Sequence, residues 1–352
     1  MKNLLIIGAG IHGTLLSIEL KKKFKNKINV DLIEKNKKIL TGTSFSTHNR
    51  ANRGFHYPRS YETAKECQLG WNYFIKHYKD CFFNIGKSYY LIEKNSRTSK
   101  EKFEKFLINN NLGYAKKFPK NIGSNKTLLT ESFEVFEGCF NHKKLTLKIQ
   151  KQIEFHNVNL ITNFEVKNFN FKKDKIILSN NKRKIYKDYD LIVNSTYADA
   201  YKTLKLIGIS KKNYKYKIQN TIVPVVYSKK KIPGLTIIDG PYCTIMPYAS
   251  EKNTYLLYDV DNSVSLNKIS NKEKKNRYIK MKKKLNKYFF EEFNFKLKKF
   301  FEGKRPIPLF NPGDRRSTLI KKDKIGKTKI ISICEGKYIS APYIIKKIAN
   351  SL

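Results

Sequence analysis

The sequence is poor in cysteine, tryptophan and acidic residues, and it contains no long apolar run. Its five cysteines form no CxxC pair and its six histidines show no HExxH-type spacing, so neither a disulfide framework nor a metal site is expected. No run approaches the roughly 18 to 20 apolar residues that cross a bilayer, and the run Leu4 to Ile7 stops at once in Gly-Ala-Gly. These absences predict a cytoplasmic protein with an unprocessed N-terminus and no membrane span.

Acidic residues are outnumbered, because the chain has 72 Lys and Arg against 29 Asp and Glu, for a net charge of +43. Such an excess ordinarily indicates nucleic acid or another anionic surface as a partner. The lysines are spread along the whole chain beside many Asn, Ile, Tyr and Phe, however, and A/T-rich coding also produces that mixture. The densest basic stretch, Lys272 to Lys287, has apolar residues at helical spacing, which predicts a solvated helix face with an apolar back. A nucleic-acid partner stays open but is not favoured.

The beginning of the chain has the pattern of an α/β protein. At 352 residues, with 40% hydrophobic residues, the chain can bury the cores of about two domains. Residues 3–7 form an all-apolar run typical of a buried parallel strand, and Leu15 to Phe24 then follow helical spacing. A second apolar run, Ile28 to Ile33, completes a strand, helix, strand unit. This unit predicts a Rossmann-like first domain.

A glycine fingerprint joins the first strand to the helix. In the pattern GxGxxG, Gly8 allows the tight turn, Gly10 lets a pyrophosphate approach the backbone, and Gly13 lets helix and strand pack closely. The helix N-terminus offers N–H groups to the phosphates. Glu34, about 20 residues further on, is placed to accept hydrogen bonds from the adenosine ribose and disfavours the 2′-phosphate of NADP. The predicted dinucleotide contacts of this unit are Gly8, Gly10, Ile11, His12, Gly13, Glu34 and Lys35.

The rest of the chain alternates helices and strands without an internal repeat. Residues 36–59 predict an ordered loop, and a loop of that length is usually functional. Ser60 is expected to cap the helix that follows, which contains Trp71. The further expected elements are a strand at 82–92, a helix around 103–107, a helix at 143–153, a strand at 158–162, two hairpin strands ending near 178, a strand at 191–193, an antiparallel sheet between 221 and 260, a strand at 329–333 and a last helix to 348.

Taken in order, the segments of the whole chain resemble the D-amino-acid oxidase superfamily of FAD-dependent oxidoreductases. The segments that carry the resemblance are the fingerprint ending in Glu34, the loop Thr43 to Arg59, Glu165-Val166, Asp190 to Tyr197, Gly303 to Pro306, and Glu335 to Tyr338. Two departures concern the flavin end: Ser195-Thr196 stand where many members have a glycine, and the final segment lacks the usual glycine-rich run. The resemblance implies FAD as cofactor and adds Thr43, Ser44, Asn49, Arg53, Val166, Ser195, Gly336, Lys337 and Tyr338 to its expected contacts.

The resemblance also directs attention to three substrate-site candidates. Arg305 is interpreted either as a bidentate hydrogen-bond donor to a substrate carboxylate or as one partner of a structural ion pair. His56 lies in the loop expected near the flavin ring and could act as acid, base or donor, and Tyr242 could bind substrate through its hydroxyl. Attachment of the flavin through His48 or His56 is an alternative that occurs in the superfamily.

The predicted architecture has two domains. A discontinuous FAD-binding domain of Rossmann type comprises residues 1–85, 135–215 and 300–352, and a substrate domain with a mainly antiparallel sheet comprises residues 86–134 and 216–299. The predicted activity is oxidation of a CH–NH or CH–OH bond in a small anionic molecule (an amino acid, amine or hydroxy acid) by hydride transfer to flavin. The electron acceptor is not indicated. Two alternatives stay open: an NAD-dependent dehydrogenase, and an RNA-binding or tRNA-modifying flavoprotein.

Overall fold

The computed structural model describes residues 1–83, 88–120, 122–172, 175–209, 216–239, 243–290, 293–309, 318–334 and 336–350. Its helices are α1 (Ile11–Phe24), α2 (Tyr61–Tyr78), α3 (Lys100–Asn109), α4 (His142–Phe155), α5 (Ala200–Ile207), α6 (Val260–Ser263), α7 (Asn271–Asn286) and α8 (Ala341–Ala349), with 3-10 turns η1 (Lys25–Lys27), η2 (Lys79–Cys81), η3 (Tyr197–Asp199) and η6 (Tyr338–Ser340). Within these residues, no helix is long and apolar enough to cross a membrane, and no group of three or more potential metal-ligating side chains is found.

The first sheet contains the predicted N-terminal unit. In the described residues it consists, in order, of β20 (Ile320–Ile325), β21 (Thr328–Ile333), β13 (Leu191–Asn194), β1 (Lys2–Ile7), β2 (Ile28–Ile33) and β9 (Asn159–Ile161). All pairs are parallel except β20 with β21. Leu4 pairs with Val30 on one side and with Leu191 on the other, which places β1 in the interior of the sheet. The all-apolar strands follow from this position, because both faces of the sheet are covered.

The two faces of the first sheet have different covers. Leu4 and Ile6 point into a core formed with α1, α2, α4 and α8, whereas Leu5 and Ile7 point into a core formed with α5 and a small meander. The meander consists of β10 (Asn168–Lys172), β11 (Lys175–Ser179) and β12 (Lys184–Lys187). The sequence predicted two of these strands. The third was missed because its lysines and exposed Tyr186 give no apolar face.

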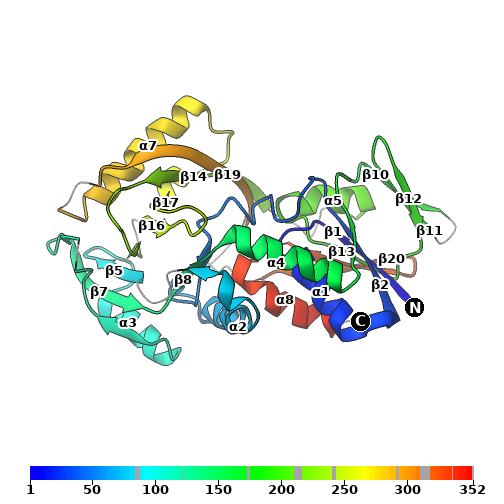
Figure 1. Ribbon diagram of the computed structural model, residues 1–352, viewed down its shortest axis with the longest axis horizontal. Coiled ribbons are helices and arrows are strands. Elements are labelled where there is room, and N and C mark those ends of the chain that lie inside the picture. Colours follow the sequence, from blue (N-terminus) through cyan, green and yellow to red (C-terminus); the bar gives the residue numbers. More distant parts are fainter. Residues whose placement is uncertain are drawn as a thin grey trace.

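The second sheet makes up the other lobe, on the left in Figure 1. Its described strands are, in order, β18 (Val264–Ser265), β14 (Tyr216–Tyr227), β17 (Thr254–Asp259), β16 (Cys243–Pro247), β15 (Gly234–Ile238), β5 (Ser88–Glu93), β7 (Leu129–Val135) and β6 (Tyr114–Lys116), with β19 (Lys296–Pro308) paired to β14. The pairing is antiparallel except between β5 and β15. The predicted α/β fold with a mainly antiparallel second sheet is therefore confirmed.

Helix α7 covers the second sheet as the sequence predicted. Tyr278, Met281 and Leu285 are buried in the core of this lobe, while most of the lysines of the helix lie on the opposite, exposed face. In Figure 1 the helix lies on the outer side of β14, β16 and β17. The apolar spacing thus correctly identified which side of the most basic stretch faces the protein.

Several local predictions need correction. Ser60 occupies the N-cap position of α2, but its hydroxyl donates to Thr63 Oγ1 (2.8 Å) and not to or from a backbone group. The strand expected at 82–92 is two strands, β4 (Phe82–Phe83) and β5; residues 84–87 between them lie outside the described part. Strand β4 forms a small sheet with β8 (Gly138–Phe140) and β3 (Arg50–Ala51). Strand β19 was not predicted, and it pairs with β14 along its whole length, from Lys296 to Pro308.

Candidate functional site

A cleft of 1310 Å³ extends between the two sheets. On one side it is lined by the turns that follow β1, β2 and β13, and on the other by residues of β14, β17 and β19. The loop 36–59 and the segment 336–339 line it as well. Ligands of open α/β sheets bind beyond the carboxyl ends of the parallel strands, and the cleft has that position relative to the first sheet.

The glycine turn between β1 and α1 is tightly packed. Gly8 has a φ of +103°, and a Cβ on Gly13 would lie 2.0 Å from the Gly8 carbonyl oxygen, so neither position accommodates a side chain. Gly10 differs, because a Cβ there would meet only Ser44 Oγ within 4 Å among the described atoms, at 3.2 Å. Ser44 Oγ also accepts from the backbone N–H of Ile11, the first residue of α1 (3.1 Å). The turn therefore presents backbone, not side chains, to the cleft.

Glu34 is held in a fixed position at the end of β2. Its side chain is buried but lines the cleft, and its two carboxylate oxygens accept from the backbone N–H groups of Ala9 and Asn36, each at 2.9 Å. Each carboxylate oxygen has a further lone pair, so these bonds orient the group and leave acceptor capacity. The acid therefore lies on the cleft as the fingerprint predicted, beside the glycine turn.

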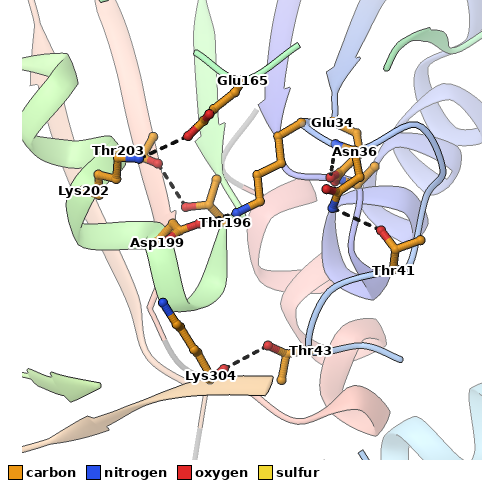
Figure 2. Close-up of polar contacts among 12 residues, drawn as sticks. Glu34, Asn36, Thr41, Thr43, Glu165, Thr196, Asp199, Lys202, Thr203 and Lys304 are labelled. Carbon is orange, nitrogen blue, oxygen red and sulfur yellow. Dashed lines mark hydrogen bonds and ion pairs between the residues drawn. The ribbon is translucent and has the colours of Figure 1, made fainter. Parts of the chain in front are cut away.

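Polar side chains from distant parts of the chain surround this end of the cleft (Figure 2). Lys35 forms an ion pair with Asp199 of η3 (2.7 Å), and Lys202 of α5 forms one with Glu165 (3.1 Å). On the second-sheet side, the hydroxyl of Thr43 donates to the carbonyl oxygen of residue 304 in β19 (2.8 Å). The loop, the first sheet and the second sheet thus meet around one opening.

The last segment of the chain is joined to the glycine turn. His12 Nε2 lies 3.0 Å from the Lys337 carbonyl oxygen, and burial lowers the pKa of His12 to about 4. The imidazole is therefore neutral near pH 7 and donates this bond. A Cβ on Gly336 would lie 2.9 Å from His12 Cε1, so the segment can approach only with glycine there. The ammonium of Lys337 lies over the ring of Tyr57, 4.5 Å from its centroid.

Cationic and aromatic side chains gather on the second-sheet side of the cleft. Arg305 of β19 donates from Nε to Gln219 Oε1 (2.8 Å) and from Nη1 to Tyr258 Oη (3.2 Å). The ring of His48 meets the ring of Tyr258 edge to face, with 5.5 Å between centroids. Burial, with the charges of Arg50 and Arg305, lowers the pKa of His48 to about 3, so this imidazole is neutral across the physiological range. No sequence pattern indicated that His48, Tyr258 and Arg305 are neighbours, because they belong to three separate segments.

Most of the sequence-predicted residues line this cleft. Those that do are Gly8, Gly10, Ile11, His12, Glu34, Lys35, Thr43, Ser44, His56, Val166, Ser195, Arg305, Gly336, Lys337 and Tyr338. Gly13 packs behind the turn, and Asn49 is buried in the loop outside the cleft lining, where its carbonyl accepts from Phe140 N–H. Arg53 lies away from the lining, with its guanidinium 5.9 Å from the Trp71 ring. Tyr242 lies outside the described residues.

Comparison with known proteins identifies the family. The sequence pattern of the family described as FAD dependent oxidoreductase (DAO) matches residues 3–325. The chain belongs to this family. Its cofactor is therefore FAD, which confirms the resemblance found in the sequence and decides against the NAD-dependent alternative. No curated protein sequence gives a significant match.

Solved structures of flavoenzymes share the fold of this FAD-dependent oxidoreductase. L-proline dehydrogenase from P. horikoshii superposes with a TM-score of 0.74 at 16% identity, covering 99% of this chain and 92% of that one. Glycine oxidase from Geobacillus kaustophilus gives 0.71 at 12% identity, with coverages of 99% and 94%. L-alpha-glycerophosphate oxidase from Mycoplasma pneumoniae, a structure with FAD bound, gives 0.71 at 16% identity, with coverages of 99% and 94%. At these identities the likeness concerns the fold alone.

The residues of the cleft fit FAD. A Cβ on Gly10 would stand in the space that a diphosphate needs in order to approach the turn, and among the described atoms Ser44 Oγ alone lies within 4 Å of that position, at 3.2 Å. The buried carboxylate of Glu34 provides fixed acceptors for ribose hydroxyls beside that turn. The last segment lies against the same turn, because the His12 ring bonds to the Lys337 carbonyl oxygen and Gly336 has no side chain to separate them. The cleft then continues to the cationic side chains of the second sheet, beyond the part that a diphosphate would occupy.

Proposed function

We propose that this FAD-dependent oxidoreductase oxidises a CH–NH or CH–OH bond of a small anionic substrate, an amino acid or a hydroxy acid, and that Arg305 binds the anionic group. The observation that carries the proposal is the set of partners of Arg305. In the described part of the chain its guanidinium donates to Gln219 and Tyr258, which are both uncharged. No carboxylate of the described residues forms an ion pair with it, so its charge is available to a ligand in the cleft.

The surroundings of Arg305 favour an anion over a neutral or cationic ligand. Gln219 and Tyr258 hold the guanidinium by two of its nitrogen atoms, and a planar fork held in this way can still bind a carboxylate or phosphate with good geometry. Lys304 is the neighbouring residue in β19 and also lines the cleft. Burial is the main cause of the lowered pKa of His48, and the charge of Arg305 adds to it.

We assign the remaining predicted residues to the cofactor. The backbone turn at Gly10, with Ser44 beside it, would hold the diphosphate and Glu34 the adenosine ribose, while residues 336–338 would lie toward the flavin. When bound, FAD supplies the acceptor for a hydride from the carbon beside the amine or hydroxyl. His56 also lines the cleft, with its ring 5.4 Å from that of Tyr57, and it would exchange the proton of the substrate amine or hydroxyl.

The names of the structural neighbours agree with this substrate class. L-proline and glycine are amino acids, and glycerophosphate is an alcohol that carries a phosphate. Each of these molecules carries an anionic group, a carboxylate in the amino acids and a phosphate in glycerophosphate. The proposal therefore requires a site for an anion, and Arg305 supplies one.

The test is substrate reduction of the flavin in the absence of oxygen. The purified holoenzyme is mixed with amino acids, hydroxy acids and glycerol phosphate, and the loss of visible flavin absorbance is followed. We expect at least one anionic compound to bleach the flavin. Arg305→Met should then raise the KM for that compound about ten- to hundredfold, because a hydrogen bond to a charged group contributes about 1.5–3 kcal/mol.

A matched substitution separates anchoring from a general effect of losing an arginine. Arg277 lies on α7, outside the cleft, and forms an ion pair with Glu273 (2.7 Å). Arg277→Met should leave the KM unchanged. Bleaching by uncharged amines alone, or an unchanged KM in Arg305→Met, would refute the proposed anchor.

A further inference from the structure

Arg50 is a charged side chain buried where the loop 36–59, called the cofactor loop below, meets the second sheet. It belongs to β3, lines the cleft, and is only 5% exposed. Its Nη1 atom forms an ion pair with Glu137 Oε2 at 2.9 Å, and the side chain of Glu137 is completely buried. Neither residue was singled out as functional from the sequence, because Arg50 is one of many basic residues and Glu137 is far from it in the chain.

The second sheet supplies the other partners of this guanidinium. Its Nη1 atom donates to Tyr90 Oη of β5 (2.6 Å), and its Nη2 atom donates to Thr236 Oγ1 of β15 (2.6 Å) and Thr244 Oγ1 of β16 (2.7 Å). The Tyr90 hydroxyl in turn donates to Glu137 Oε2 (2.9 Å). The pair is therefore fixed by neighbours from several strands, and its charges cannot rotate away.

Glu137 also fixes the cofactor loop directly. Its Oε1 atom accepts from the backbone N–H of Arg53 at 3.0 Å. Burial raises the pKa of Glu137, and the Arg50 guanidinium and these donors oppose that shift by stabilising the carboxylate. The loop between residues 50 and 53 is thus held at both ends by one buried carboxylate.

Loop anchoring alone does not explain a buried ion pair. Removing two charges from water carries a large desolvation penalty, and apolar residues of similar volume often hold a structure as well or better. Arg50 nevertheless lines the cleft beside His48, and its charge adds to the effect of burial in lowering the pKa of that imidazole. Glu137 therefore compensates the positive charge at the cleft wall only in part.

We propose that Arg50 holds a fixed positive charge at the wall of the cofactor cleft and that Glu137 sets how strongly this charge acts on the bound flavin. A flavin gains negative charge on reduction, so a nearby fixed cation favours the reduced form. Arg50 and Glu137 are then positioning residues that adjust the reduction potential. The inference does not depend on which substrate binds at Arg305.

The reduction potential of the holoenzyme tests this inference without any substrate. Wild type, Glu137→Gln and the double variant Arg50→Met/Glu137→Gln are equilibrated with a reference dye, and the ratio of reduced to oxidised flavin is measured. Glu137→Gln leaves the cation uncompensated and should raise the ratio about tenfold, which is about 30 mV for a two-electron couple. The double variant removes the cation as well and should lower the ratio below that of wild type by a similar factor.

A control and a second outcome distinguish charge from structure. Asp80→Asn removes an exposed carboxylate that pairs with Lys148 away from the cleft, and it should leave the ratio unchanged. If the pair only anchors the loop, the variants will melt at lower temperatures while the ratio stays at the wild-type value, and the proposal is overturned. The double variant leaves no buried charge unpaired. If Glu137→Gln loses FAD, the flavin ratio of the double variant therefore tests the proposal. Loss of FAD from both variants would also overturn the proposal in favour of a purely structural role.

Discussion

Gly10 and Gly13 of the fingerprint have different surroundings, so alanine substitutions at these two positions should have different effects on stability and FAD binding. A Cβ on Gly13 would lie 2.0 Å from the Gly8 carbonyl oxygen and 2.7 Å from Ser195 Oγ. Because the first of these is a backbone atom, α1 must move away from the turn after β1 to relieve the contact. Overpacking in a well-packed core costs about 1–3 kcal/mol, and a clash with backbone belongs at the upper end, so we expect Gly13→Ala to destabilise the apoprotein by about 3 kcal/mol.

Gly10→Ala should have the opposite pattern. Among the described atoms its new methyl group would meet only Ser44 Oγ, at 3.2 Å, so a small shift of that hydroxyl relieves the contact and the fold is kept. The methyl group would project into the space through which a diphosphate approaches the backbone. We therefore expect the melting temperature to stay within about 2 °C of wild type, while the Kd for FAD rises at least about tenfold, equivalent to about 1.4 kcal/mol.

Two measurements check this contrast. Thermal unfolding of the apoproteins, followed by circular dichroism, should show a decrease of about 6 °C for Gly13→Ala, at roughly 2 °C per kcal/mol for a chain of this size. Titration with FAD, followed by its fluorescence, gives the affinities. Gly113→Ala is the control, because a Cβ there meets no described atom within 4 Å. The reasoning is refuted if Gly13→Ala has the melting temperature of wild type, or if Gly10→Ala binds FAD with the wild-type Kd.

Two further predictions follow from buried polar groups in the same region. Glu34→Gln should raise the Kd for FAD about tenfold, because hydrogen bonds from the ribose to a charged acceptor are replaced by weaker ones; an unchanged Kd in the fluorescence titration would contradict the ribose assignment. Burial lowers the pKa of His142, like that of His12, from 6.5 to about 4. Between these values the unfolded chain binds protons that the folded protein does not, so stability should decrease as the pH falls from 6.5 to 4. His142→Phe should flatten that decrease in thermal melts, and an identical pH profile would contradict it.

Local patterns were sufficient for the first unit of the fold. The apolar runs of β1 and β2, the helical spacing of α1 and the glycines between them fixed both the elements and the position of Glu34 on the cleft. Those features depend on contacts between residues close in sequence, which is why a short stretch can specify them. Strand β19 was missed for the same reason. Its lysine-rich first half has no strand pattern of its own, and its pairing partner β14 lies far away in the chain.

The sequence by itself determined the type of fold, the cofactor and the glycine turn that presents backbone to it. Tertiary structure alone decided which side chains share the substrate end. Tyr258 and Arg305 come together because β14 pairs with both β17 and β19, and the loop 36–59 brings His48 against Tyr258. It also decided that Arg53 lies over Trp71, while Arg50 is buried with Glu137. Burial and charge pairing depend on the sum of many distant contacts, and a one-dimensional pattern does not contain that sum.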